Sequence, residues 1–287
     1  MLKHDSIPEL RAQLKQWRVA GESLALVPTM GNLHHGHLRL VEVARQNADR
    51  VVVSIFVNPL QFAPGADFDA YPRTLIEDLD KLMPFAVDAV FIPDVNAMYV
   101  DTMGTSTKVS VPELSDMLCG EFRPRHFEGV TTIVAKLFNI VQPDVAVFGE
   151  KDYQQLVIIK RMVADLNFAV DVFGVETIRE SGGLAMSSRN QYLSEEQRLQ
   201  ASHLYKVLVD IVLKVKSLKS KNTLSISDMR QMEQQSLLRL SEYGFRPEYL
   251  TICDASTLSP ATAATETMRV LVAAWLGEAR LIDNLPV

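Results

Sequence analysis

Residues 24–37 read LALVPTMGNLHHGH, an apolar run followed by a turn and then by the start of a helical pattern. Two imidazoles, His34 and His37, stand three residues apart with Gly36 between them. Residues at this spacing share one face of a helix, with Cβ atoms about 5–6 Å apart, and the first N–H groups of a helix can bind an anion. Gly36 removes a side chain where a base or ribose would lie against the backbone. The stretch therefore predicts a strand, a turn and a helix that together can hold a nucleoside triphosphate.

Strand-like apolar runs alternate with helical patterns up to about residue 175. The predicted strands are residues 24–27, 50–57, 89–92, 145–148 and 170–175. The predicted helices are residues 38–48, 75–83, 130–141 and 156–163. Buried strands that alternate with helices indicate a parallel sheet with right-handed crossovers, so we predict an α/β fold with a Rossmann-like doubly wound sheet. Residues 98–118 are irregular, and a small hairpin is predicted within them.

The pattern changes after Ile178, where we place a boundary between domains 1–178 and 179–287. Ser181-Gly182-Gly183 is expected to be a flexible link, and Ser194 with Gln197 forms the pattern of a helix-starting capping box. Helices are predicted over residues 204–215 and 227–243, with a solvated lysine-rich loop at 214–221 between them. Strands are predicted at 249–253 and 269–276. This region is interpreted as a smaller α+β domain.

Composition narrows the class of protein. The chain has 287 residues, of which 47% are hydrophobic and 22% are charged, as expected for a globular protein of two domains. A net charge of -6 argues against a general nucleic-acid binder. Cys119 and Cys253 fit neither a metal-binding spacing nor a disulfide framework. The N-terminus does not resemble a signal peptide and no apolar run is long enough to cross a membrane, so a cytoplasmic location without a membrane partner is expected.

Four polar clusters each follow a predicted strand. They are Pro28–His37, Asn58–Gln61, Gly149–Asp152 and Met186–Arg189. Ligands of open parallel sheets bind beyond the carboxyl ends of the strands. The topology therefore predicts that these clusters meet at one edge.

Each cluster also has a simpler interpretation. An H-x-x-H pair can hold zinc or can be one surface and one buried histidine, although no convincing third and fourth zinc ligand is present; His35 is expected to point away. A Gly-Glu-Lys-Asp loop is usually solvated, but Lys151 at a helix N-terminus opposes the helix dipole unless an anion is bound there. Gln155, one turn further, would offer its amide to the same molecule.

The remaining candidates leave similar alternatives open. Ser187, Ser188 and Arg189 can surround a triphosphate with hydroxyls and a guanidinium, or they can form only a cap and a turn. The amide of Gln61 suits a hydroxyl or carboxylate ligand, or bonds its own loop. Arg123 and Arg125 lie in a basic turn and are interpreted as surface or lid residues.

Several strings together resemble one enzyme family. They are PTMGNLHHGH, FVNPLQF, DAYPRT, RPRHFEGV, FGEKDYQQL and GLAMSSRN, and they run in order from about Leu24 to Leu193. This set is similar to the pantothenate synthetases (pantoate–β-alanine ligases), within the wider superfamily of HIGH-type nucleotidyl-transfer folds. His34-x-x-His37 resembles the HIGH signature. Met186–Arg189 stands at the place of the KMSKS signature, with serines and an arginine instead of the two lysines.

The resemblance implies a reaction in two steps and a set of site residues. The pantoate carboxylate would attack the α-phosphate of ATP, and β-alanine would then attack pantoyl adenylate to give pantothenate and AMP. The residues implied for ATP are Pro28, Thr29, Met30, Gly31, Asn32, Leu33, His34, His35, Gly36, His37, Gly149, Glu150, Lys151, Asp152, Ile178, Met186, Ser187, Ser188 and Arg189. The residues implied for pantoate are Gln61 and Gln155, with Gln61 also bordering β-alanine. The residues implied in catalysis are His37, His34, Lys151, Ser187, Ser188 and Arg189. The resemblance also implies ATP as a substrate with Mg²⁺ and a homodimer formed through the larger domain. The smaller domain would act as a lid, hinged at residues 181–183.

Two other functions fit parts of the sequence. A nucleotidyltransferase with the same histidine motif would leave NMP on a small-molecule product. An RNA-binding module derived from a synthetase core is a third hypothesis, and the acidic charge and the lack of an evident anticodon-binding domain count against it.

Overall fold

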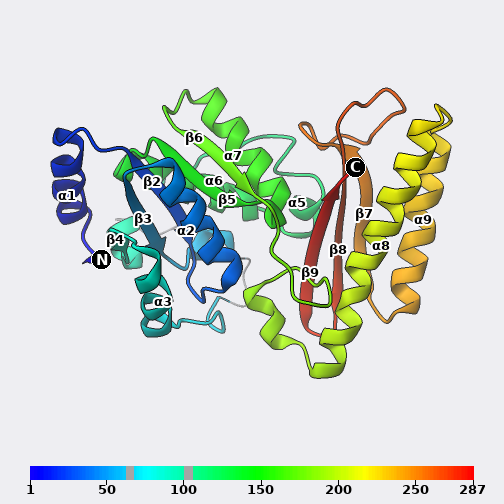
Figure 1. Cartoon of the computed structure of the whole chain (residues 1–287), viewed down its shortest axis with the longest axis horizontal. Coiled ribbons are helices and arrows are strands. Elements are labelled where there is room, and N and C mark those ends of the chain that lie inside the picture. The colour runs from blue at the N-terminus through cyan, green and yellow to red at the C-terminus, as the bar shows by residue number, and fades with distance from the viewer. Residues whose placement is uncertain (63–67, 100–105) are drawn as a thin grey trace. The chain divides into compact units, whose positions relative to one another are not determined.

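The computed structural model describes residues 1–62, 68–99 and 106–287, which form two compact units (Figure 1). The first unit comprises Met1–Glu150 and Gln155–Glu176, and the second comprises Lys151–Gln154 and Thr177–Val287. Residue 178, where the sequence analysis places a boundary, lies just inside the second unit. Ser181–Gly183 also lies inside the second unit, so the predicted hinge does not separate the two units.

The first unit contains a parallel sheet in the order β1-β4-β3-β2-β5-β6 among the described residues. Its strands are β1 (Leu2–His4), β2 (Leu24–Thr29), β3 (Arg50–Ile55), β4 (Ala89–Phe91), β5 (Val145–Gly149) and β6 (Asp171–Val175). The predicted doubly wound parallel sheet is confirmed. The short strand β1 is an addition, because three residues do not show a recognisable alternation.

The winding of this sheet reverses at β2. The chain moves from β2 to β3 and β4 on one side, and β5 then pairs with the other side of β2. Ala25 pairs with Val145, so Thr29 and Gly149 end their strands at the same level. The carboxyl ends of β2 and β5 therefore border the switch point where ligands of such sheets bind.

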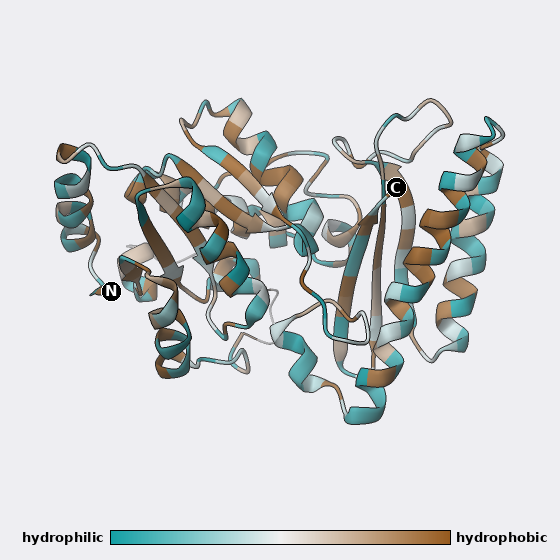
Figure 2. Ribbon diagram, viewed as in Figure 1, coloured by the Kyte–Doolittle hydropathy of each residue, from teal (hydrophilic) through white to brown (hydrophobic). Residues whose placement is uncertain are grey.

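Helices with an apolar stripe cover the sheet. In α2 (His35–Asn47) the buried residues Leu38, Val41 and Ala44 recur at helical spacing and pack in one cluster with β2 and β3. Figure 2 shows β2 and β3 as mostly hydrophobic and α2 as mixed. The other helices are α1 (Ile7–Val19), η1 (Pro59–Gln61), α3 (Leu75–Leu82), η2 (Met83–Phe85), α4 (Val95–Met98), α5 (Cys119–Phe122), α6 (His126–Val141), η3 (Glu150–Asp152) and α7 (Tyr153–Asp165).

The hairpin predicted within residues 98–118 falls in part outside the described residues. Residues 106–118 contain bends and turns and no strand. A hairpin is therefore not found in the described part of this segment.

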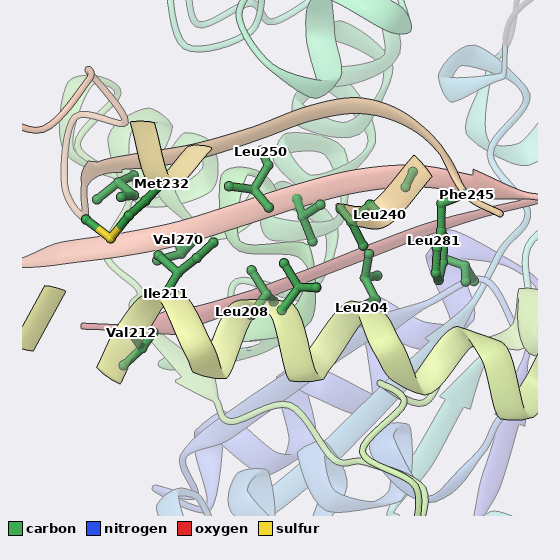
Figure 3. Packing of buried hydrophobic residues seen from close by; sticks show 14 of the residues in the cluster. Leu204, Leu208, Ile211, Val212, Met232, Leu240, Phe245, Leu250, Val270 and Leu281 are labelled. Atoms are coloured by element: carbon green, nitrogen blue, oxygen red, sulfur yellow. The ribbon is translucent and has the colours of Figure 1, made fainter. Parts of the chain in front are cut away.

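The second unit packs two long helices on an antiparallel sheet. Its elements are η4 (Ser188–Tyr192), α8 (Glu195–Ser220), α9 (Ile226–Glu242), β7 (Arg246–Asp254), β8 (Met268–Leu276) and β9 (Ala279–Pro286). The core joins Leu204, Leu208 and Ile211 of α8 to Val270 and Leu281 of the sheet (Figure 3). This arrangement confirms the predicted smaller α+β domain.

Two details of the second unit differ from the sequence analysis. The lysine-rich loop predicted at 214–221 is wrong, because α8 continues to Ser220 with Val215 fully buried and the lysines on the outer side. Lysine is a good helix former, so its charge marks an exposed face and not a loop. The strand β9 is missing from the prediction, since its polar residues Asp283 and Asn284 interrupt the apolar pattern. The capping box of Ser194 and Gln197 is confirmed.

Candidate active site

The turn after β2 depends on two residues with positive φ. Gly31 has φ of 79° and Asn32 has φ of 50°, the left-handed region in which glycine is unstrained and asparagine is tolerated. A Cβ on Gly31 would come within 3.0 Å of Asp78 Oδ2. Backbone angle and space therefore both require glycine at this point of the turn.

The two motif histidines cap the first turn of α2. Nδ1 of His34 accepts a hydrogen bond from the N–H of Gly36 at 3.1 Å, and Nδ1 of His37 accepts one from the N–H of His34 at 3.2 Å. The ring centroids are 4.1 Å apart. A neutral imidazole carries its proton on the nitrogen that does not accept. The proton of each ring is therefore on Nε2. The third histidine of the motif, His35, is exposed on the helix surface, as expected.

A buried carboxylate from α3 holds the same turn, and the sequence analysis does not identify it. Asp78 is 0% exposed and accepts from the N–H groups of Asn32 at 2.8 Å and Leu33 at 2.7 Å. Lys81, one turn further in α3, donates to the carbonyl oxygen of Leu33 at 2.8 Å. Asp78 lies one helical turn before the fully buried Leu82. An acidic residue on the apolar face of a helix indicates that its carboxylate has a buried hydrogen-bond partner, and this is the signal in the sequence that could have identified Asp78.

Gln61 is held by a chain of hydrogen bonds that runs through the buried residues Tyr99 and Asn58. Tyr99 donates to Oδ1 of Asn58 at 2.8 Å, and Nδ2 of Asn58 donates to Oε1 of Gln61 at 3.1 Å and to the carbonyl oxygen of Gly129 at 3.0 Å. Burial raises the pKa of Tyr99 above its ordinary value, so its hydroxyl stays protonated. Since Oε1 of Gln61 is an acceptor here, its amide NH₂ is the group that faces Met30, with Nε2 at 3.0 Å from the sulfur.

The basic turn lies beside Gln61. His126 Nδ1 is 2.8 Å from the carbonyl oxygen of Gln61, and its Nε2 is 3.1 Å from Arg123. The side chain of Arg125 is 71% exposed. The interpretation of Arg125 as a surface residue agrees with this exposure, while Arg123 contacts the segment that supports Gln61.

The end of β5 belongs to the first unit up to Glu150. Gly149 and Glu150 are both half-buried, and Gln155 is half-buried in the first part of α7. Gly149 is level with Thr29 in the sheet, as described above. The first unit thus brings together the turn of Pro28–His37, Gln61 with Met30, and the end of β5.

Lys151 and Asp152 group with the second unit. The Lys151 ammonium is 3.7 Å from Oδ2 of Asp152, and its side chain is 19% exposed. The Lys151 carbonyl oxygen accepts from Nδ2 of Asn284 in β9 at 3.0 Å. The backbone of the lysine is therefore held by the C-terminal sheet.

Ile178 and Met186 are the two ends of a short hairpin in the second unit. The N–H of Met186 donates to the carbonyl oxygen of Ile178 at 2.9 Å, and Arg179 and Ala185 form a bridge. Ser187 then caps η4, because its Oγ accepts from the N–H of Arg189 at 3.2 Å. The interpretation of this segment as a cap and a turn is therefore correct, and it does not conflict with phosphate binding by Ser188 and Arg189.

Lys151 and Ser187 line one narrow cavity in the second unit, together with Asn190 and Asp283. Its volume is about 10 Å³, close to the space of a single water molecule. Asn190 is 3% exposed and donates to Glu180 at 2.9 Å and to the carbonyl oxygen of Ala185 at 3.1 Å. The second unit thus brings Lys151 and the Ser187 segment together.

Across residues 1–62, 68–99 and 106–287, no three His, Cys, Asp or Glu side chains are grouped so as to hold a metal ion. No helix in this part of the chain is both long and apolar enough to span a bilayer.

Comparison with known proteins identifies the family. The family model described as pantoate-beta-alanine ligase matches residues 3–286. The pantothenate synthetases of Shewanella pealeana and Azotobacter vinelandii are each 50% identical over 287 residues, covering 100% of this chain and 99% of theirs.

Solved structures agree with this result. The crystal structure of pantothenate synthetase from Thermus thermophilus has a TM-score of 0.88 and 45% identity, covering 99% of both chains. Pantoate-beta-alanine ligase from Francisella tularensis, complexed with β-γ ATP and β-alanine, has a TM-score of 0.81 and 30% identity, covering 100% of this chain and 97% of that one. The chain therefore belongs to the pantoate–β-alanine ligase family.

Proposed function

We propose that this chain condenses pantoate with β-alanine to pantothenate through pantoyl adenylate, releasing AMP and pyrophosphate from ATP. The observation that carries the proposal is the cap of α2. Its two histidines accept backbone N–H bonds at Nδ1, which places the proton of each neutral ring on Nε2, at the switch-point end of β2. Membership of the family supplies the reaction.

In the first step a carboxylate oxygen of pantoate attacks the α-phosphorus of ATP, and the bond to pyrophosphate breaks. Negative charge on the phosphoryl oxygens grows in the transition state, and fixed donors and cations stabilise it. The residues to which we assign this role are His34, His37, Lys151, Ser187, Ser188 and Arg189. No side chain of the chain is needed as a nucleophile.

Pantoate is assigned to Gln61 and Gln155. The Asn58 contact commits Oε1 of Gln61 as an acceptor, so the NH₂ group of Gln61 is the part suited to a carboxylate or hydroxyl oxygen of pantoate. We place β-alanine next to Gln61 for the second step. There its amine attacks the acyl carbon and AMP leaves with the former carboxylate oxygen.

The other assignments follow the same proposal. ATP would enter as MgATP, since Mg²⁺ keeps several waters and binds readily to substrate phosphates. The backbone of residues 28–37, with Gly149, Glu150, Asp152, Ile178 and Met186, is assigned to ATP. The second unit is assigned the role of a lid that protects the mixed anhydride from water. A cytoplasmic homodimer, formed through the first unit, is expected, and light scattering would show twice the chain mass of 32.1 kDa.

The direct test is release of pyrophosphate from ATP with pantoate present and β-alanine absent. We expect release that depends on pantoate; none under saturating MgATP would contradict the proposal. A product that keeps a stable nucleotide would instead support a nucleotidyltransferase.

Variants of the assigned donors test the mechanism. H37A and K151A should each lower the rate of pyrophosphate release by about 100- to 1,000-fold, the usual cost of one well-placed donor. K160A removes an exposed lysine of α7 and is the matched control for K151A, with the parental rate expected. A parental rate in H37A or K151A would remove that residue from the mechanism.

A further inference from the structure

Two adjacent polar residues of β9, Asp283 and Asn284, are each only 3% exposed. Successive side chains of a strand point to opposite faces of its sheet. Asp283 and Asn284 therefore reach different segments of the second unit from one place on the strand. Buried polar groups persist when they are hydrogen-bonded, and both of these residues bond to segments that carry assigned site residues.

Asp283 holds the hairpin of residues 178–186. Its two carboxylate oxygens accept from the two terminal nitrogens of Arg179 at 2.6 and 2.9 Å. The same guanidinium donates to the carbonyl oxygen of Gly183 at 3.0 Å and lies 4.1 Å from the ring centroid of Tyr205. A bidentate pair with a stacked guanidinium has a defined geometry. Asp283 thus fixes the hairpin that leads directly into Ser187.

Asn284 holds the backbone of Lys151. Its Oδ1 accepts from Nε of Arg269 at 2.6 Å, and its Nδ2 donates to the carbonyl oxygen of Lys151 at 3.0 Å. Arg269 in turn lies 3.7 Å from the ring centroid of Tyr153. Since Arg269 can only donate, it sets the orientation of the Asn284 amide and leaves the NH₂ group for Lys151.

The two contacts are also linked to each other. The N–H of Asn284 donates to Oδ1 of Asp283 at 2.7 Å. Lys151, Ser187 and Asp283 line the same narrow cavity. One short piece of β9 therefore sets the distance between the lysine loop and the Ser187 segment.

We propose that Asp283 and Asn284 are positioning residues for adenylation, which hold Lys151 and the segment Ser187–Arg189 in one fixed arrangement. This inference rests on the proposed function, because it assumes that both segments act on the phosphates of ATP. Neither residue needs to touch the substrate for this role.

The test compares D283N and N284D with the matched control E248Q. Glu248 accepts from Arg280 at 2.7 Å and from the indole of Trp275 at 2.6 Å. The side chains of Arg280 and Glu248 are 11% and 12% exposed, in the same sheet. E248Q therefore weakens a comparable buried ion pair. Its partners, Arg280 and Trp275, are not assigned to the ATP or pantoate site. N284D keeps the shape and the acceptor for Arg269, and replaces the donor that faces the Lys151 carbonyl with a negatively charged oxygen.

We expect D283N and N284D to lower kcat for pantoate-dependent pyrophosphate release by about 10- to 100-fold, as small misplacements of catalytic groups do. The KM for pantoate should stay unchanged, and E248Q should keep the parental kcat. Amide exchange should be faster than in E248Q for residues 178–190 in D283N and for residues 151–154 in N284D.

Parental kcat and exchange in both variants, or an equal loss of kcat in E248Q, would overturn the inference. A parent enzyme that releases no pyrophosphate would instead contradict the proposed function. Amide exchange would then still judge the positioning role, since it does not depend on activity.

Discussion

The Asp78 carboxylate offers a sharp test of how the turn after β2 is built. Asp78 is fully buried and accepts from the N–H groups of Asn32 and Leu33 at 2.8 and 2.7 Å. The variant D78N has nearly the same shape, but its amide can accept only one of these bonds well, and its NH₂ group faces the other N–H. We therefore expect the variant to fold with a weakened turn.

The expected loss of stability in D78N follows from these two hydrogen bonds. Losing a hydrogen bond to a charged group costs about 1.5–3 kcal/mol, and a buried donor without a partner costs about 1–3 kcal/mol. Because these two costs overlap, the free energy of unfolding should fall by about 3 kcal/mol. If ATP binding must restore the turn, the same energy corresponds to a rise of up to about 100-fold in the KM for ATP.

The assay distinguishes an effect on the turn after β2 from a general loss of stability. Urea unfolding of D78N in a W275F background would follow Trp17, which lies in the first unit. The control is D88N, whose carboxylate accepts from the N–H of Val51 at 2.8 Å at the opposite, amino-terminal edge of the same sheet. D88N should lose stability and keep the parental KM for ATP. An unchanged KM for ATP in D78N would refute the view that Asp78 shapes the ATP site.

Three further predictions concern Gln61 and the second unit. Y99F removes the donor to Asn58 and should raise the KM for pantoate about tenfold, from a loss of about 1–2 kcal/mol, with the KM for ATP unchanged; steady-state kinetics with each substrate varied would check this. G129A should also raise the KM for pantoate and lower the melting temperature, because its Cβ would lie 2.6 Å from the backbone nitrogen of Gln61. A parental KM and melting temperature would contradict this prediction. Hydrogen bonds from Ser256 and Thr257 lower the pKa of Asp254. The stabilisation by this carboxylate is therefore present above the unfolded pKa of about 3.9. It is lost as the pH falls through the lower pKa of the folded state. Urea unfolding should show D254N less stable than the parent at pH 7 and equal to it in strong acid; a constant difference would contradict this.

The sequence predicted the first unit well, for a physical reason. Strands buried on both faces, such as β3 (Arg50–Ile55), have continuous apolar runs that contrast with the helical spacing around them. β1 and β9 were not predicted, because β1 is short and β9 contains the buried polar pair Asp283 and Asn284. The lysines of α8 suggested a loop, although Val215 and Leu218 continue the helical period.

The positions of the candidate site residues could be predicted where they depend on topology, and less where they depend on tertiary hydrogen bonds. Residues that follow parallel strands, such as His34 and Gly149, could be placed at the ligand edge from the strand order alone. Asp78 and Asn284 bond to backbone groups of residues far away in the chain. Only their polar character at buried positions marks them, and a sequence does not say which backbone groups they meet.

In the proposed reaction, a pantoate carboxylate oxygen becomes bonded to the α-phosphorus of ATP. Pantoate labelled with ¹⁸O in its carboxylate, incubated with MgATP, β-alanine and the enzyme in unlabelled water, tests this most directly. Mass spectrometry should find one labelled oxygen in AMP, because AMP leaves with that oxygen when the amine attacks. Pantothenate formed together with unlabelled AMP would contradict a reaction through pantoyl adenylate.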